Sequence, residues 1–105
     1  MFNGLFLFCR QKAKKFFLEW KNSGSGYRTT SFTINATTPP NSNYSIFYRQ
    51  NNTGDFVLLA SNLVGDQTIN IAGTKYQDTD LRIQLFGNGT ATPKIYRVKF
   101  NTQNI

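Results

Sequence analysis

Residues 78–100 read DTDLRIQLFGNGTATPKIYRVKF and hold the clearest pattern in the chain. Apolar and polar side chains alternate in residues 81–85 and again in residues 96–100, with a loop over residues 87–92 between them. A period of two residues buries one face of each segment, as in a half-exposed β-strand. The stretch therefore predicts two antiparallel strands joined by a loop.

Further strands are predicted outward from this pair, because short β-prone segments are bounded by turn residues. Turns are expected at Thr38–Asn41, Asn51–Gly54 and Gly65–Asp66. The complete set of expected strands covers residues 15–21, 28–36, 44–50, 55–60, 67–72, 80–86 and 94–101. Seven short strands with no helix between them predict an all-β fold, an antiparallel β-sandwich, with a barrel as the alternative.

The alternation also assigns the two faces of each strand. The residues expected in the core are Ile34, Ile46, Tyr48, Leu58, Ile69, Ile71, Leu81, Ile83, Leu85, Val98 and Phe100. The residues expected in solvent are Thr33, Arg49, Gln67, Arg82, Gln84 and Arg97. No exposed apolar run is expected on the sandwich itself.

The N-terminal segment has a different pattern. Its apolar residues recur at spacings of three and four, which predicts an amphipathic helix to about residue 13, and residues 15–21 also alternate as a first strand. Two parts are therefore expected, a basic amphipathic segment at 1–14 and a β-sandwich domain at 15–105. The apolar stripe would be covered by its own domain or by a partner, and a membrane or nucleic acid is the alternative. The predicted partner-docking residues are Phe2, Leu5, Phe6, Phe16 and Phe17.

Composition limits the chemistry that this chain can perform. The chain has 105 residues, enough for one domain, and it contains no His and one Cys. This excludes an internal disulfide and the usual zinc, copper and haem ligand sets, so no cofactor, no metal and no enzymatic activity are expected. Asp78 and Asp80 resemble half of a Ca²⁺ site, and a solvated turn is the simpler interpretation.

The charge distribution and the short sequence motifs indicate no further partner. Of the net charge of +7, five units fall in residues 1–28, and the later cations are scattered, so neither nucleic acid nor membrane is expected as a partner. The apolar run at 2–9 is too short to cross a bilayer, and its cations follow it, unlike those of a signal peptide. Four Asn-X-Ser/Thr sequons occur at Asn35, Asn43, Asn51 and Asn88.

Tyrosine and arginine side chains stack on sugar rings and bind hydroxyl groups. Core filling or ordinary surface placement is the alternative for each of them. The glycan-contact candidates are Tyr48, Arg49, Arg82 and Tyr96.

Four pieces of sequence carry a resemblance to a known family. They are EWKNSG at 19–24, IFYRQ at 46–50 with the turn TGD at 53–55, DLRIQL at 80–85, and ATPKIYRV at 91–98. The stretch from Phe17 to Phe100 resembles a jelly-roll, galactose-binding-like β-sandwich module of phage tail or baseplate proteins. The resemblance implies virion attachment, structural spacing or glycan contact, and it assigns no ligand-binding residue here.

We therefore expect a noncatalytic structural or attachment module of a bacteriophage particle, located in the virion and present in many copies. It would dock on neighbouring virion proteins of the tail, baseplate or capsid. The alternative is a carbohydrate-binding module of a bacterial or phage surface protein, with a cell-surface glycan as its ligand.

Overall fold

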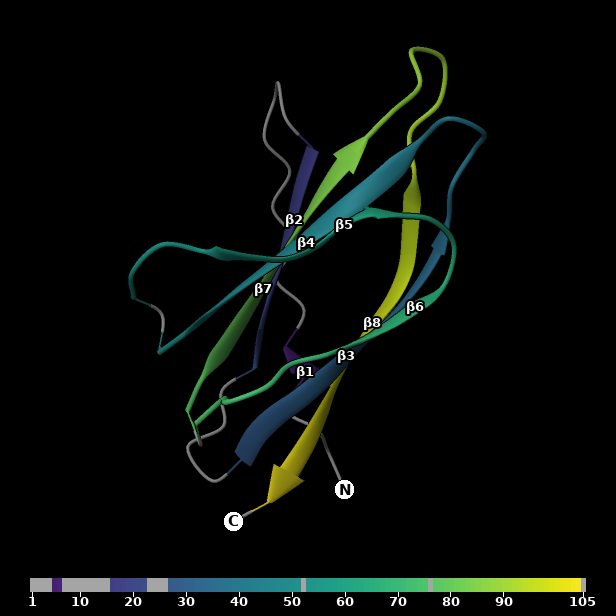
Figure 1. Cartoon of the computed structure of the whole chain (residues 1–105). Helices are drawn as coiled ribbons and strands as arrows, with labels where there is room; N and C mark the ends of the chain where they lie inside the picture. The colour runs from purple at the N-terminus through teal and green to yellow at the C-terminus, as the bar shows by residue number, and fades with distance from the viewer. Residues whose placement is uncertain (1–4, 7–15, 23–26, 52, 76, 105) are drawn as a thin grey trace.

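The computed structural model describes residues 5–6, 16–22, 27–51, 53–75 and 77–104. In these ranges the chain forms eight strands and no helix (Figure 1). The strands are β1 (Leu5–Phe6), β2 (Phe16–Asn22), β3 (Tyr27–Thr37), β4 (Asn43–Gln50), β5 (Val57–Leu63), β6 (Gln67–Asn70), β7 (Thr79–Phe86) and β8 (Lys94–Asn104).

The seven strands expected from the sequence are confirmed as β2 to β8, with ends that differ by no more than three residues. Asn51 and Gly54 have φ values of 61° and 79°, as the predicted turn requires, and Gly65 has a φ of 64°. The helix expected up to about residue 13 lies outside the described residues, except for Leu5–Phe6. Those two residues form strand β1 and pair with β2.

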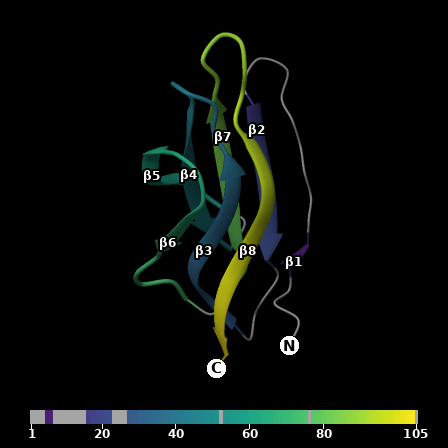
Figure 2. The same ribbon diagram turned by 90° about the vertical axis from the view of Figure 1, so that its right-hand side faces the viewer.

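The strands form two antiparallel sheets, which confirms the predicted sandwich. The large sheet has the order β1-β2-β7-β4-β5 and the small sheet the order β6-β3-β8. Figure 2 shows β3 and β8 in front of β7, with β5 and β6 at one side and β1 at the other. Because five strands face three, the small sheet cannot cover the whole inner face of the large one.

The core lies between the two sheets, where alternate residues of the central strands meet. Phe32 and Phe100 are fully buried, and their rings meet edge to face with centroids 5.0 Å apart. The buried apolar residues are Phe32, Ile34, Ala36, Tyr44, Ile46, Ile71, Leu81, Ile83, Val98 and Phe100. Around them pack Leu18, Tyr48, Leu59, Ala60, Leu63, Ile69, Leu85 and Ile95, each partly buried.

Leu58 was expected in the core, and this prediction is wrong. Its side chain is 54% exposed, because β5 pairs with β4 in a register that places Leu58 opposite Phe47 on the outer face of the large sheet. An irregularity in the β4–β5 pairing between Ile46 and Phe47 shifts the alternation, and Leu59 packs against the core instead.

Candidate functional site

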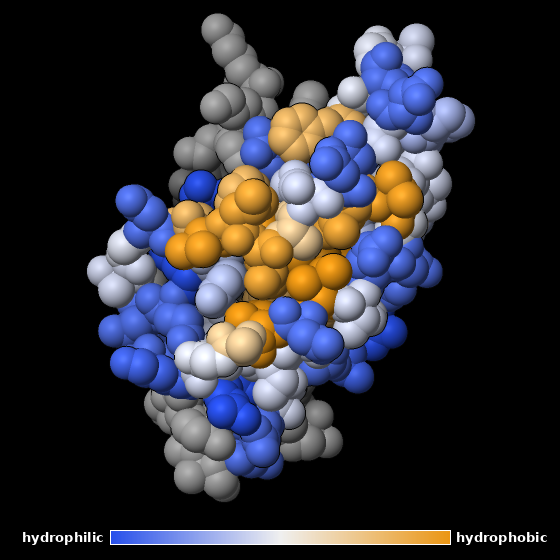
Figure 3. Space-filling model, viewed as in Figure 1, coloured by the Kyte–Doolittle hydropathy of each residue, from blue (hydrophilic) through white to orange (hydrophobic). Residues whose placement is uncertain are grey.

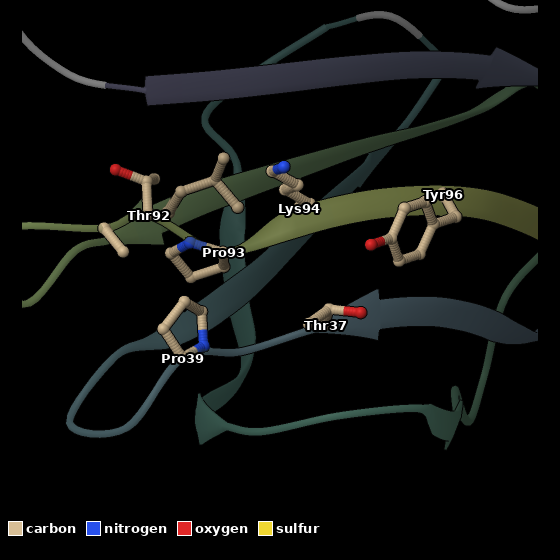
Figure 4. A pocket seen from close by; sticks show the side chains of 8 residues that line it. Thr37, Pro39, Thr92, Pro93, Lys94 and Tyr96 are labelled. Carbon is tan, nitrogen blue, oxygen red and sulfur yellow. The ribbon is translucent and has the colours of Figure 1, made fainter.

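A pocket of about 570 Å³ lies at the end of the sandwich where the β3–β4 and β7–β8 connections meet (Figures 1 and 4). Pro39 and Pro93 lie at one end of this pocket and the Tyr96 ring at the other, with Thr37 and Lys94 between them (Figure 4). The lining is completed by Leu85, Ala91 and Thr92. A space of this size suits one or two sugar-sized groups.

We call this space the end pocket. Hydrogen bonds within and between the β3–β4 and β7–β8 loops hold its rim. The Asn88 side-chain amide donates to the carbonyl oxygen of Pro40 at 2.6 Å, which links the loops. Its side-chain oxygen accepts from the backbone N–H groups of Thr90 and Ala91. A Cβ added at Gly87 would lie 2.8 Å from the Ala91 carbonyl oxygen, so the loop closes there only around glycine.

A third loop supports the same end of the molecule. In the β5–β6 turn, the Gly65 N–H donates to the Thr38 hydroxyl at 3.0 Å, and the Tyr44 hydroxyl donates to the Gly65 carbonyl at 2.7 Å. The Ala36 N–H donates to the Asp66 carboxylate at 2.8 Å. Burial, together with the nearby charge of Asp66, raises the pKa of Tyr44 to about 12.

A β-bulge gives Tyr96 its position. Along β3 and β8, Asn35 pairs with Arg97 and Ala36 pairs with Ile95, so Tyr96 is an extra residue with no partner of its own in the ladder. Bulges redirect side chains, and the Tyr96 ring is 66% exposed although Ile95 packs against the core. The ring therefore offers an open face to a ligand.

A second cluster lies on the outer face of the large sheet. The guanidinium groups of Arg49 and Arg82 lie 4.4 Å and 4.0 Å from the centre of the Phe56 ring. Arg49 binds the Asp80 carboxylate at 2.8 Å, and Arg82 binds Glu19 at 2.7 Å. Each arginine thus has both a carboxylate and an aromatic partner, which is the arrangement of a structural contact.

Asp80 is the most enclosed charge of this cluster, at 2% exposure. One of its oxygens binds Arg49, and the other has no hydrogen-bond partner. The adjacent pocket, of about 310 Å³, is lined by Phe47, Asp55, Phe56, Arg82 and Gln84. Within the described ranges no group of three or more His, Cys, Asp or Glu side chains could hold a metal ion.

An apolar surface runs along β5 and into the turn that follows it. The exposed residues are Val57, Leu58 and Val64, each more than half exposed. Figure 3 shows the side of the molecule on which β5 lies toward the viewer, and apolar side chains gather across it. The expectation of no exposed apolar run on the sandwich is therefore wrong. β5 ends the strand order of the large sheet, and Leu58 lies on the outer face of that sheet, which is turned away from the three-stranded sheet.

The structure separates the predicted glycan contacts. Arg49 and Arg82 come together on the outer face of the large sheet, Tyr48 packs against the core, and Tyr96 stands at the end pocket. The partners of Tyr96 in the pocket, such as Lys94, were not predicted. Lys94 directly follows Thr92 and Pro93, which belong to the ATPKIYRV stretch at 91–98.

The docking prediction for the N-terminal segment remains untested. Phe2 lies outside the described residues, and Leu5 and Phe6 form β1 at the edge of the large sheet opposite β5. Phe16 and Phe17 belong to β2, at register positions opposite Leu85 and Gln84. Of the two candidate Ca²⁺ ligands, Asp80 lies in β7 and binds Arg49, and Asp78 directly precedes β7 and accepts a hydrogen bond at its backbone carbonyl from the Asn51 N–H.

No helix long and apolar enough to cross a membrane occurs in the part of the chain that the structure describes. Comparison with protein-family models, curated proteins and solved structures returned no match to this chain.

Proposed function

We propose that this chain is a noncatalytic structural or attachment module of a bacteriophage particle, located in the virion, which docks on a neighbouring virion subunit. The observation that carries the proposal is the exposure of apolar side chains on the edge strand β5 and in the turn after it, namely Val57, Leu58 and Val64. Residues 56–65 contain no charged side chain in a chain of net charge +7. Such an edge would otherwise promote aggregation, and a partner strand would cover it.

The docking would combine two kinds of contact. The free edge of β5 offers backbone N–H and C=O groups to an extended segment of the partner, and the exposed apolar side chains supply the hydrophobic contact. The N-terminal residues Phe2, Leu5, Phe6, Phe16 and Phe17 are proposed as a second docking element, because β1 and β2 lie at the opposite edge of the large sheet. Many copies in one assembly would strengthen both contacts through effective concentration.

The test uses particles produced from the phage genome that carries this gene. Leu58→Lys places a charge in the apolar surface, and Thr68→Lys places one on the exposed side of β6 as a matched control. We expect Leu58→Lys to lower the number of copies per purified particle at least tenfold and Thr68→Lys to leave it unchanged, as counted by quantitative mass spectrometry. Absence of the wild-type chain from the particles would refute the proposal.

A carbohydrate-binding module is a second candidate, because the end pocket presents the exposed Tyr96 ring beside hydroxyl groups and the Lys94 ammonium group. Aromatic faces beside polar groups are the usual contacts of sugars. A glycan array with the wild-type protein should then show saturable binding that Tyr96→Ala removes. An array without binding would refute this second candidate, and the structural role would remain as the proposed function.

A further inference from the structure

Among the residues that the structure describes, the small sheet carries a cluster of positive charge. Strands β3, β6 and β8 contain Arg28, Lys94, Arg97 and Lys99 and no acidic residue. In the large sheet, by contrast, Arg49 and Arg82 are bound to carboxylates. Lys94, Arg97 and Lys99 are all exposed and have no carboxylate partner among the described residues. Their charge is therefore available to an external anion.

The register places these three cations on one side of β8. Val98 and Phe100 are buried, so the residues that alternate with them, Arg97 and Lys99, face outward about 7 Å apart. Lys94 joins the same side, because the bulge at Tyr96 adds one residue to β8 between Lys94 and Arg97. The cations thus form a row that begins at the end pocket.

A row of neutral polar residues lies beside the cations. Lys94, Arg97 and Lys99 pair in register with Thr37, Asn35 and Thr33 of β3. The Asn101 side-chain amide donates to the hydroxyls of Ser31 and Thr33 at 2.9 Å, which orders this face. The surface therefore combines charge, hydroxyl groups and amides, and one exposed aromatic ring stands where it meets the pocket.

We propose that this surface binds an acidic polysaccharide. One sugar ring would stack on Tyr96 in the end pocket, and the carboxylate or sulfate groups of the following sugars would meet Lys94, Arg97 and Lys99. This inference rests on the carbohydrate-binding candidate and specifies its ligand class. An acidic polysaccharide fits better than a nucleic acid, because single-stranded nucleic acids are held by successive stacking rings, and among the described residues this face presents one exposed tyrosine.

The experiment measures binding of the full chain to immobilised polygalacturonate, dextran sulfate, neutral dextran and oligo-dT by biolayer interferometry. The variants are Tyr96→Ala, the double variant Arg97→Gln/Lys99→Gln, and Lys75→Gln as a control. Lys75 is an exposed cation in the loop before β7, whereas the end pocket follows the other end of that strand. The control removes one charge and the double variant two, so a purely nonspecific effect of net charge would lower affinity in proportion.

We expect binding to polygalacturonate or dextran sulfate, weakened at least tenfold by Tyr96→Ala and by the double variant and less than twofold by Lys75→Gln. Carboxylate and sulfate ligands are distinguished by which of the two polymers binds. Equal binding to neutral dextran would overturn the ligand class and leave the carbohydrate-binding function standing. Tighter binding to oligo-dT than to the polysaccharides would also overturn the proposed ligand class. So would an equal loss of affinity for each charge removed, together with no effect of Tyr96→Ala. If none of the polysaccharides bound, both the acidic ligand class and the carbohydrate-binding function would be refuted.

Discussion

The phenol of Tyr44 makes the stability of this fold sensitive to alkaline pH. The Tyr44 side chain is fully buried, and its hydroxyl donates to the Gly65 carbonyl at 2.7 Å. Burial raises the pKa of Tyr44 to about 12 from its ordinary value of 10.0, with a smaller contribution from the Asp66 charge. The folded state therefore holds the neutral phenol at pH values at which the unfolded chain releases its proton.

The sign and size of the effect follow from this difference in pKa. The folded pKa is raised, so the stabilisation is fully present below pH 10 and is lost progressively as the pH rises from 10 to about 12. At pH 11 the unfolded phenol is about nine-tenths ionised and the folded phenol about one-tenth, which corresponds to a loss of about 1.4 kcal/mol.

The assay compares urea unfolding of the wild type and of Tyr44→Phe at pH 8 and pH 11 by circular dichroism. Tyr44→Phe should cost about 1–3 kcal/mol at pH 8, because the Gly65 carbonyl loses its donor. At pH 11 this difference should shrink by about 1.4 kcal/mol, since only the wild type loses stability through this phenol. Tyr96→Phe, which removes the hydroxyl of an exposed ring, is the control substitution. A Tyr44→Phe difference that does not change with pH would refute the reasoning.

Four further substitutions test packing, ion pairing and a loop glycine. Arg49→Ala should lower the free energy of unfolding by about 2–3 kcal/mol, because it leaves the Asp80 carboxylate buried without its cation. Arg82→Ala should cost no more than about 1 kcal/mol, because both members of its ion pair keep some water, and equal losses in urea titrations would contradict this assignment. Phe32→Ala should cost about 3–5 kcal/mol in calorimetry through lost burial and a core cavity, and an unchanged melting temperature would show that the site is not packed. Gly87→Ala should destabilise the chain measurably in thermal denaturation, because the added methyl would meet a backbone oxygen at 2.8 Å, and a neutral result would mean that the loop adjusts freely.

Local patterns predicted the strands well and individual side-chain positions less well. All seven expected strands occur, because alternation and turn residues act over a few neighbouring positions. Phe32 and Tyr44 were not among the expected core residues, although each lies two residues from one that was. Leu58 was misplaced because a register irregularity in the β4–β5 pairing interrupts the alternation, and such an irregularity is a property of two strands together.

The candidate sites depended on contacts between distant segments. Arg49 and Arg82 meet at Phe56 because β4 and β7 are neighbours in the large sheet, which no motif in the sequence indicated. The end pocket joins Thr37 and Tyr96, which come from strands that pair across the small sheet. Tyr96 was a candidate from its residue type alone, whereas its exposure results from the bulge.

The sequence by itself determined that this chain consists of short antiparallel strands, because periodicity and turn residues are local quantities. Tertiary structure alone decided which surfaces stay open. Strand order places β5 at the edge of the large sheet, and the bulge at Tyr96 puts Lys94 on the outer side of β8 together with Arg97 and Lys99. The physical reason is that exposure depends on what packs against a residue, and packing partners are chosen by the whole chain.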